Sequence, residues 1–484
     1  MIFTCTYERT TVSFDTEAAS FTSIRVGSQQ MIGGETPVFK ISLMDKKGNR
    51  SVFSATDAKK VSVLGKEVIY EGFSCGGLTV VVYFPEDGTG NYRIRAKVPG
   101  DLCAEWVDFP RLALQPLIKN GGPGAILFPF NEGALVDDIR VREASPAFHH
   151  WEAGYPSQGC YAVFPNMVFS QFLAYVTESG SLYVGAHDEK RGVKQIDFYP
   201  EGDTVVLQNK VFTGASFGQE YEQDFPWVIC GAGNTWQQAA DVYKTWLRSH
   251  MPENMPKIKD NPKIPAWYKE SPVVISYPVR GIHDMDRMTP NALFPYTNAL
   301  PMVRSIQEKT HSKIMVLLIH WEGTAPWAPP YVWPPYGGEK PLLAFRDTLH
   351  EEGNLLGVYC SGFGFTKHSN LTGYEGESLL KEKHYLGGMC AAPSGRVKNS
   401  LICCAQRSGY DVCPASDIGK SILNEAYQPL FENDLDYAQI LDQNHGGGQY
   451  FCYGKNHGHA PVPGAWMTEN MQNFLFLQNF YNIH

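Results

Sequence analysis

The ten residues KIMVLLIHWE, Lys313–Glu322, place a compact apolar run directly before three polar or aromatic side chains. Such an unbroken run is typical of a strand that is covered on both faces, as in a parallel sheet. Four runs of this kind are predicted to be strands: Val273–Tyr277, Ile314–His320, Leu355–Cys360 and Tyr437–Leu441. Between them, helical periodicity predicts helices over Leu300–Lys309, Leu342–Glu351 and Ile418–Phe431. This alternation predicts a parallel sheet of βα units, either an open sheet or a (β/α)8-type barrel.

The chain up to about Ser216 has a different pattern, in which short strands are separated by turn residues. In the clearest strand, apolar and charged residues alternate from Tyr92 to Val98, so one face is expected to be buried and the other wet. This strand follows the run Leu78–Phe84 across a turn that contains Pro and Gly, which is typical of a hairpin. Many such units predict a large antiparallel β-sandwich.

The segment after the sandwich combines a helix with a connector. Trp236, Tyr243 and Trp246 lie at helical spacing behind Asn234, a suitable N-cap residue, and predict a helix over about 235–248 whose aromatic stripe is buried. Four prolines between 252 and 265 then predict a stiff connector. We therefore expect a sandwich over 1–225, a linker over 226–268 and a catalytic α/β domain over 269–484.

Composition limits the classes of protein. The 484 residues are 43% apolar and 19% charged, as in an ordered protein with a large core, and suggest two or three domains. The net charge of -9 has no blocks of like sign, which argues against nucleic acid and membrane partners and favours a neutral substrate. The eleven cysteines lack regular spacing, so neither a disulfide framework nor a zinc ribbon is expected. With no leader-like N-terminus and no long apolar stretch, the prediction is a cytoplasmic protein.

Ligand sites in parallel sheets lie at the carboxyl ends of the strands. Aromatic and polar residues follow the first two predicted strands, and the second opens into a loop in which prolines hold aromatic rings that could stack on a sugar. The competing interpretation is a loop that merely packs on the sandwich. Candidate binding residues in this region are Tyr277, His320, Trp321, Trp327 and Trp333.

The most specific signal is DLDYAQILDQNHGGG, residues 434–448, which places Asp442 at the end of an apolar strand and Gln443 beside it. A carboxylate there can face a pocket as the nucleophile of a retaining glycosidase, which pairs two carboxyls about 5 to 5.5 Å apart. The alternative is a carboxylate that caps the next helix or turn. Downstream, His457 and His459 are interpreted as contacts to sugar hydroxyls. No third ligand stands at standard metal spacing, so no metal and no cofactor are predicted.

Several segments together resemble bacterial glycoside-hydrolase-like proteins of the family called domain of unknown function 6259. They include SFDTEAASFTSIRVG, SLYVGAHDEKRGVKQ, NTWQQAADVYKTWLRSH, YDVCPASD, ILDQ and HGHAPVPGAWMTE. The resemblance covers nearly the whole chain. It implies kinship with α-galactosidases and endo-α-N-acetylgalactosaminidases, and a galactose-mutarotase-like super-sandwich before a (β/α)8 barrel. It also implies that ILDQ carries the nucleophile, Asp442, and that Ser416 begins the preceding helix.

The chain departs from that pattern at its end. In related barrels the acid/base carboxylate comes from a later strand, and no segment after Asp442 is predicted to form strands five to eight. A complete barrel takes about 250 residues, so we expect only its first half, in a chain that is truncated or that assembles with a partner or as a homo-oligomer. Alone, it is expected to show little or no glycosidase activity. Within the chain, Glu322, Asp284 and Asp286 are the candidates for the second carboxylate.

Three function classes remain open: a glycosidase acting on a glycoside or oligosaccharide with Asp442 and Glu322 as the in-chain carboxylates, a non-catalytic carbohydrate-binding or degenerate relative, and an isomerase or epimerase that uses the sandwich. The last would need a His and Glu pair facing a sandwich cleft.

Overall fold

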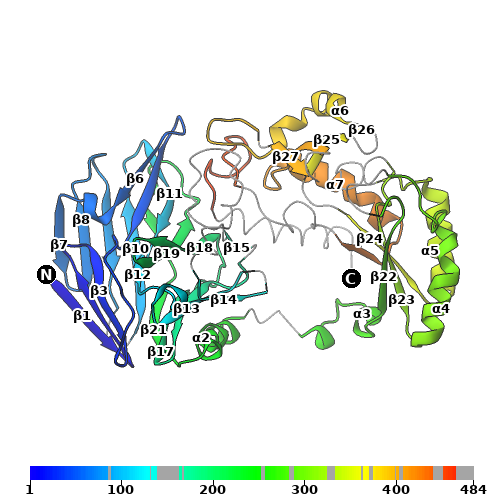
Figure 1. Cartoon of the computed structure of the whole chain (residues 1–484). Coiled ribbons are helices and arrows are strands. Elements are labelled where there is room, and N and C mark those ends of the chain that lie inside the picture. Colours follow the sequence, from blue (N-terminus) through cyan, green and yellow to red (C-terminus); the bar gives the residue numbers. More distant parts are fainter. Residues whose placement is uncertain are drawn as a thin grey trace. The chain divides into compact units, whose positions relative to one another are not determined.

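The computed structural model describes residues 1–85, 89–130, 132–138, 163–165, 168–251, 257–282, 288–323, 333–360, 364–369, 374–397, 399–402, 407–439 and 451–464. The chain divides into two compact units (Figure 1). The first comprises Met1–Pro252 with Ala460–Thr468, and the second comprises Glu253–His459 with Glu469–His484. Each unit is described by itself.

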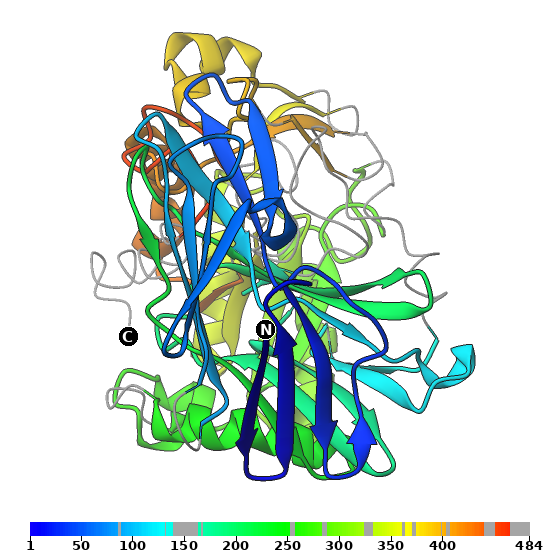
Figure 2. The same ribbon diagram turned by 90° about the vertical axis from the view of Figure 1, so that its left-hand side faces the viewer.

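The first unit begins with a four-stranded antiparallel meander, whose strands appear in dark blue in Figure 2. Its strands are β1 (Ile2–Tyr7), β2 (Thr10–Asp15), β3 (Ser20–Val26) and β4 (Gln29–Gln30). Buried and less buried positions alternate along β2, as expected for a strand with one face on the core.

Two larger antiparallel sheets complete this unit. One has the order β14-β13-β16-β17-β21-β10-β9-β8-β7, with β20 also paired to β10, and the other has the order β15-β18-β19-β11-β5-β6, with β12 also paired to β19. The strands of the first are β7 (Lys60–Leu64), β8 (Glu67–Glu71), β9 (Thr79–Tyr83), β10 (Asn91–Lys97), β13 (Gly124–Phe128), β14 (Ala134–Val136), β16 (Phe172–Thr177), β17 (Gly180–Ala186), β20 (Tyr221–Glu222) and β21 (Trp227–Ala232). Those of the second are β5 (Lys40–Asp45), β6 (Arg50–Ser54), β11 (Leu102–Asp108), β12 (Leu112–Leu114), β15 (Val163–Phe164), β18 (Lys194–Glu201) and β19 (Thr204–Phe212).

One hydrophobic core joins the three sheets. It includes Phe14 of β2, Ile41 of β5, Val82 of β9 and Leu207 of β19, each with almost no exposed surface. The expected hairpin is confirmed, because β9 and β10 pair antiparallel with Ile94 opposite Val82. The N-terminal part of the chain is therefore sandwich-like, as its alternation predicted.

The expected helix is α2 (Trp236–Ser249), but it begins one residue later than Asn234 would place it. The N-cap is Thr235, whose hydroxyl accepts a hydrogen bond from the backbone N–H of Gln238 at 3.3 Å. Tyr243 is buried on the sandwich strands, whereas Trp236 remains 47% exposed, so the aromatic stripe is only partly buried. Since β21 pairs with β17 and α2 packs beside it, the first unit continues past residue 225.

The second unit is organised by a parallel sheet, β22-β23-β24-β29, in which each strand lies next to its predecessor. Its strands, β22 (Val273–Pro278), β23 (Ile314–Ile319), β24 (Leu355–Tyr359) and β29 (Tyr437–Gln439), match the four predicted runs to within a few residues. Helices α4 (Leu300–Thr310) and α5 (Glu339–Glu351) alternate with the strands as predicted and lie on one side of the sheet (Figure 1). The parallel direction is as the apolar runs predicted. However, β22 is not covered on both faces as expected, because Val274 is 53% exposed.

An insertion between β24 and the next helix escaped prediction. It is an antiparallel sheet of order β26-β25-β28-β27, formed by β25 (Gly364–Ser369), β26 (Tyr374–Glu375), β27 (Asn399–Ile402) and β28 (Arg407–Asp411), together with the short helix α6 (Glu377–Glu382) and the 3-10 turn η5 (Tyr385–Gly388). Its strands are short and rich in polar residues, so neither period is distinct. It leads into α7 (Asp417–Glu432), where Ser416 is the N-cap as predicted and accepts the N–H of Gly419 at 2.9 Å.

The remaining helical segments are short: η1 (Ala55–Asp57), η2 (Ile118–Asn120), η3 (Ile258–Asp260), α3 (Ala266–Lys269) and η4 (Tyr296–Ala299). Over the part of the chain that the structure describes, no helix is both long and apolar enough to cross a membrane.

Candidate functional site

Arg280 joins the carboxyl ends of β22 and β23, a role that the sequence alone did not indicate. Its guanidinium donates hydrogen bonds to the backbone carbonyls of His320, at 3.3 Å, and of Glu322. In return, Nδ1 of His320 donates to the Arg280 carbonyl at 2.8 Å. These reciprocal bonds hold the chain just beyond both strands in one conformation.

Arg280 is only 3% exposed, and its guanidinium lies over the ring of Tyr336 with 4.4 Å to the centroid. Burial lowers the pKa of Arg280, and the negative charge of Glu322 opposes that shift. A buried guanidinium needs such partners, because an uncompensated charge is costly in a low-dielectric interior. The strand ends therefore enclose a cation beside Glu322.

The backbone around Glu322 forms a small antiparallel pair with residues 334–336. The N–H of Gly323 donates to the Pro334 carbonyl at 2.8 Å, and the N–H of Tyr336 donates to the Trp321 carbonyl at 2.7 Å. A Cβ at position 323 would stand 2.2 Å from the Pro334 oxygen, so this close approach requires glycine. Hydrogen bonds at both sequence neighbours, Trp321 and Gly323, thus fix the backbone at Glu322, the predicted carboxylate, which has 0% exposure.

The aromatic candidates have different surroundings. Trp321 is fully buried and donates its indole N–H to the Tyr359 carbonyl at 2.9 Å. Trp333 is half-buried, lies 6.3 Å from Trp321 between ring centroids, and donates its indole N–H to Glu339 at 2.6 Å. Tyr277 belongs to the same core, and burial raises the pKa of its phenol. The described rings therefore support the strand ends, and of the three candidates Tyr277, Trp321 and Trp333, the last is the least buried.

Other candidates lie outside the described residues: Asp442, Gln443, Trp327, Asp284 and Asp286. The described chain reaches Gln439, the last residue of β29, which pairs parallel with β24. The sequence places Asp442 three residues beyond that strand end. The assignment of Asp442 to a pocket therefore stays a prediction.

His457 and His459 are brought together with two cysteines that sequence reasoning left aside. One ligand atom from each of Cys413, Cys452, His457 and His459 lies within 4.8 Å of all the others. Cys413 is distant in sequence from the other three, so spacing rules for metal sites could not connect them. The cluster offers two sulfur and two nitrogen donors and could hold a metal ion.

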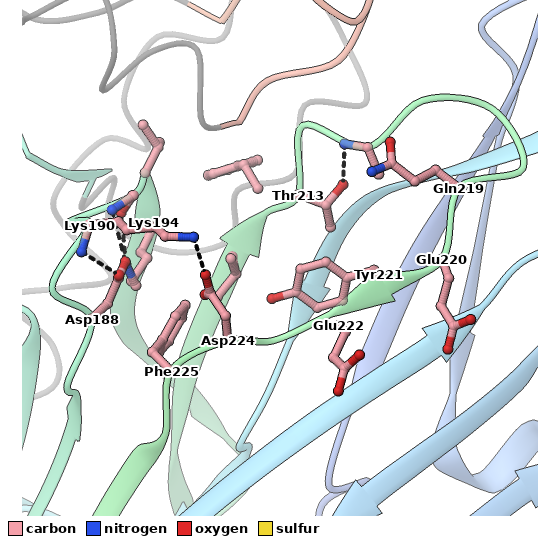
Figure 3. A pocket seen from close by; sticks show the side chains of 15 residues that line it. Asp188, Lys190, Lys194, Thr213, Gln219, Glu220, Tyr221, Glu222, Asp224 and Phe225 are labelled. Carbon is pink, nitrogen blue, oxygen red and sulfur yellow. Dashed lines mark hydrogen bonds and ion pairs between the residues drawn. The ribbon is translucent and has the colours of Figure 1, made fainter.

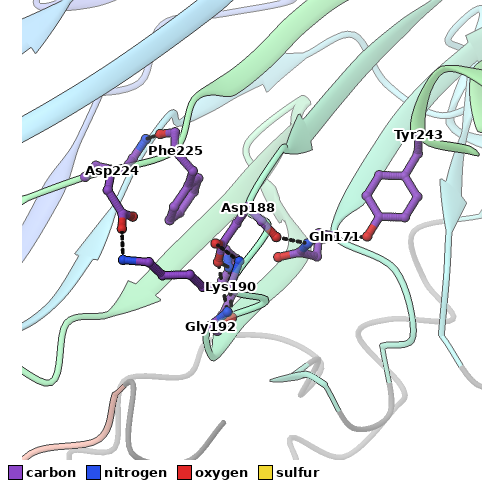
Figure 4. Close-up of polar contacts among 9 residues, drawn as sticks. Gln171, Asp188, Lys190, Gly192, Asp224, Phe225 and Tyr243 are labelled. Carbon is purple, nitrogen blue, oxygen red and sulfur yellow. Dashed lines mark hydrogen bonds and ion pairs between the residues drawn. The ribbon is translucent and has the colours of Figure 1, made fainter. Parts of the chain in front are cut away.

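The sandwich unit contains a separate pocket of about 350 Å³, lined partly by the buried ion pair of Lys194 with Asp188 (Figure 3). Burial is the main cause that lowers the pKa of Lys194, and Asp188 opposes it. The backbone carbonyl of Asp188 accepts from Gln171 at 3.0 Å, while Lys190 pairs with Asp224 (Figure 4). Among the described residues, those that line this pocket include Glu220 and Glu222 but no histidine.

The fold and sites define a chain with an antiparallel sandwich-like unit followed by a parallel α/β unit whose strand ends carry buried polar residues. Residues 221–477 match the family described as Domain of unknown function (DUF6259), just over half of the chain, and the protein belongs to this family. No curated protein matches the sequence.

Solved structures share the fold at low sequence identity. The α-N-acetylgalactosaminidase NagBb from Bifidobacterium bifidum, in its GalNAc complex, superposes with a TM-score of 0.65 at 12% identity over 99% of this chain and 75% of that chain. The ligand-free structure of the same enzyme superposes with a TM-score of 0.64 at 13% identity, over 99% of this chain and 76% of that chain. The galactosidase domain of the α-galactosidase–sucrose kinase AgaSK superposes with a lower TM-score of 0.47 at 10% identity, over 99% of this chain and 70% of that chain. Identities this low show the fold alone.

Proposed function

We propose that the protein is a glycoside hydrolase that acts on a glycosidic bond, with Asp442 as the nucleophile of a retaining mechanism and Glu322 as its in-chain partner. The observation that carries this proposal is the sequential parallel sheet, because Glu322 and Asp442 each follow the carboxyl end of one of its strands. That edge is where parallel α/β folds bind ligands. The fold shared with an α-N-acetylgalactosaminidase supports the same class of reaction.

Strand spacing makes the pairing of the two carboxylates sterically reasonable. β23 and β29 flank β24, so their backbones are separated by two strand spacings, about 9.6 Å. The mechanism requires the two carboxyl groups to be closer than this, at the roughly 5 to 5.5 Å of a retaining pair. In the first step an Asp442 oxygen bonds to the anomeric carbon while the glycosidic C–O bond breaks and Glu322 protonates the leaving oxygen. Water then hydrolyses the glycosyl ester, with Glu322 as general base.

The proposal is tested by turnover of an aryl α-N-acetylgalactosaminide, with an aryl α-galactoside as second substrate, by the chain 1–484. If Glu322 is the acid/base partner, the chain should show measurable turnover, in contrast to the half barrel of little or no activity expected from the sequence. This turnover should be lost in Asp442→Asn and fall by roughly 10²- to 10⁴-fold in Glu322→Gln. Matched controls are Asp434→Asn and Glu308→Gln, which change exposed residues of the same unit and should leave turnover unchanged. Trapping with a fluorinated glycosyl substrate should add the sugar mass to the peptide containing Asp442. Turnover that survives in Asp442→Asn would contradict the assignment.

The second candidate is a carbohydrate-binding protein without catalysis. The complete burial of Glu322 favours it, since a general acid must reach the leaving oxygen. In that case the wild-type chain binds N-acetylgalactosamine or galactose in calorimetry, no aryl glycoside is turned over, and Glu322→Gln leaves the affinity unchanged.

A further inference from the structure

We propose that Cys413, Cys452, His457 and His459 form a tetrahedral site for a zinc-class metal ion in the second unit. The proposal rests on the convergence of two thiols and two imidazoles in one place. Three of the four residues are buried, and His459 is half-buried. The proposal replaces two predictions made from the sequence: His457 and His459 bind a metal and not sugar hydroxyls, and a metal is present. It uses none of the carboxylates assigned to the glycosidase reaction.

Backbone pairing places the thiols. The segment around Cys390 lies between two others: the N–H of Cys390 donates to the Asp411 carbonyl at 2.7 Å, and the N–H of Tyr453 donates to the Ala391 carbonyl at 2.8 Å. Cys413 is joined to the same segment through its N–H, which donates to Gly388 at 2.8 Å. Backbone hydrogen bonds between these segments therefore hold the cysteines in place, as a site that must not rearrange around its ion requires.

The distances between donors fit a tetrahedron around one ion. Sγ of Cys452 lies 3.2 Å from Nδ1 of His457, and Sγ of Cys413 lies 3.6 Å from Nε2 of His459. With zinc–sulfur bonds of about 2.3 Å and zinc–nitrogen bonds of about 2.0–2.1 Å, a tetrahedral site separates sulfur from nitrogen by about 3.5 Å. The longest separation allowed within the cluster, 4.8 Å, requires only small adjustments to reach such a geometry.

A third buried thiol lies beside the cluster. The thiol of Cys390 hydrogen-bonds to both Cys413 and Cys452. It therefore has the position of an outer-shell partner of the ligand sulfurs.

The surroundings of the ligands are those of a built site. The N–H of Gly454 points to Sγ of Cys452 at 3.4 Å, and a Cβ at position 454 would stand 2.4 Å from the His457 ring. The His457 ring also hydrogen-bonds to the backbone of Gly387, which orients it as second-shell partners orient metal-bound imidazoles. Ser416 accepts from Gly419 and donates to the Cys413 carbonyl at 2.9 Å, fixing the turn that carries this ligand.

The donor set selects the metal. Two thiolates and two imidazoles in a tetrahedron suit Zn²⁺, whereas Ca²⁺ and Mg²⁺ require oxygen ligands. Four protein donors leave no open position, so the ion would be structural. It would join the start of α7 to the segment after β29, and so fix the far end of the chain stretch 440–451 that carries Asp442.

The experiment is metal analysis of the chain 1–484, purified without a histidine tag from zinc-supplemented medium. We expect about one zinc per chain by plasma mass spectrometry. Replacement by Co²⁺ should give the thiolate charge-transfer band and the intense visible bands of tetrahedral cobalt. Modification of the wild-type thiols with an organomercurial should release the zinc, a measurement that needs no variant to fold. Cys452→Ser and His457→Gln should lose the metal, while His457→Cys, which keeps a soft ligand, should retain it.

Cys103→Ser is the matched control, because Cys103 is a buried free cysteine of the first unit and its replacement should leave the zinc content unchanged. Three results would overturn the proposal: wild-type protein without stoichiometric metal, a disulfide among Cys390, Cys413 and Cys452 in the intact mass, or undiminished zinc in the Cys413→Ser/Cys452→Ser double variant. None of these measurements uses a sugar, so failure here is distinguishable from failure of the glycosidase proposal.

Discussion

Replacing Arg280 by methionine should destabilise the carboxyl ends of β22 and β23. The guanidinium makes two hydrogen bonds to backbone carbonyls and lies over the Tyr336 ring. Hydrogen bonds from a charged group contribute about 1.5–3 kcal/mol each, and a desolvated cation–π contact about 2 kcal/mol. Methionine avoids the cost of burying a charge, which offsets part of this loss. We expect a net loss of about 2–4 kcal/mol.

The assay is hydrogen exchange by mass spectrometry on the peptide 314–323, together with urea unfolding of the whole chain. A loss of this size corresponds to roughly 30- to 1000-fold faster exchange when exchange follows the opening equilibrium. Arg304→Met is the matched control: Arg304 is exposed on α4 and pairs with Glu352, and such pairs are worth about 0–1 kcal/mol. If protection of 314–323 in Arg280→Met equals that in the control, Arg280 does not hold the strand ends.

Three further predictions concern buried groups. Burial lowers the pKa of Lys210 to about 7, so between about pH 7 and 10.5 the unfolded chain binds a proton that the folded chain does not, and the stability of the protein rises with pH. In urea unfolding, the gain in stability from Lys210→Met should therefore be largest below pH 7 and vanish toward pH 10. A gain that does not depend on pH would refute this prediction. Arg111→Met leaves the buried Asp108 carboxylate without its ion-pair partner at 2.6 Å. It should lower the free energy of unfolding by about 3–5 kcal/mol in the same measurement, and adding Asp108→Asn should restore part of that loss. Gly454→Ala should displace the His457 ring and lower the zinc content, and full occupancy would show that the ring can move aside.

The sequence alone determined the elements whose signals are local. The apolar run Ile314–Ile319 is a buried parallel strand, and the alternation from Tyr92 to Val98 is a strand with one face on the core. Ser416 caps its helix as its residue type indicated. These features depend on neighbours within a few positions, which periodicity and capping preferences report directly. At the start of α2, Thr235 caps in place of Asn234 because both residue types can serve and backbone geometry decides between them.

Tertiary structure alone decided which distant residues meet. Arg280 was visible after the first predicted strand, but its role depends on carbonyls of the next strand end, which only the parallel register brings within reach. The sequence distance between Cys413 and the two histidines, His457 and His459, matches no metal-binding motif. Cys413 comes near them because of the polar insertion between β24 and α7. A metal or catalytic site needs side chains that converge on one point. Strand pairing between segments far apart in the sequence decides which side chains converge, and local sequence patterns give almost no information about that pairing.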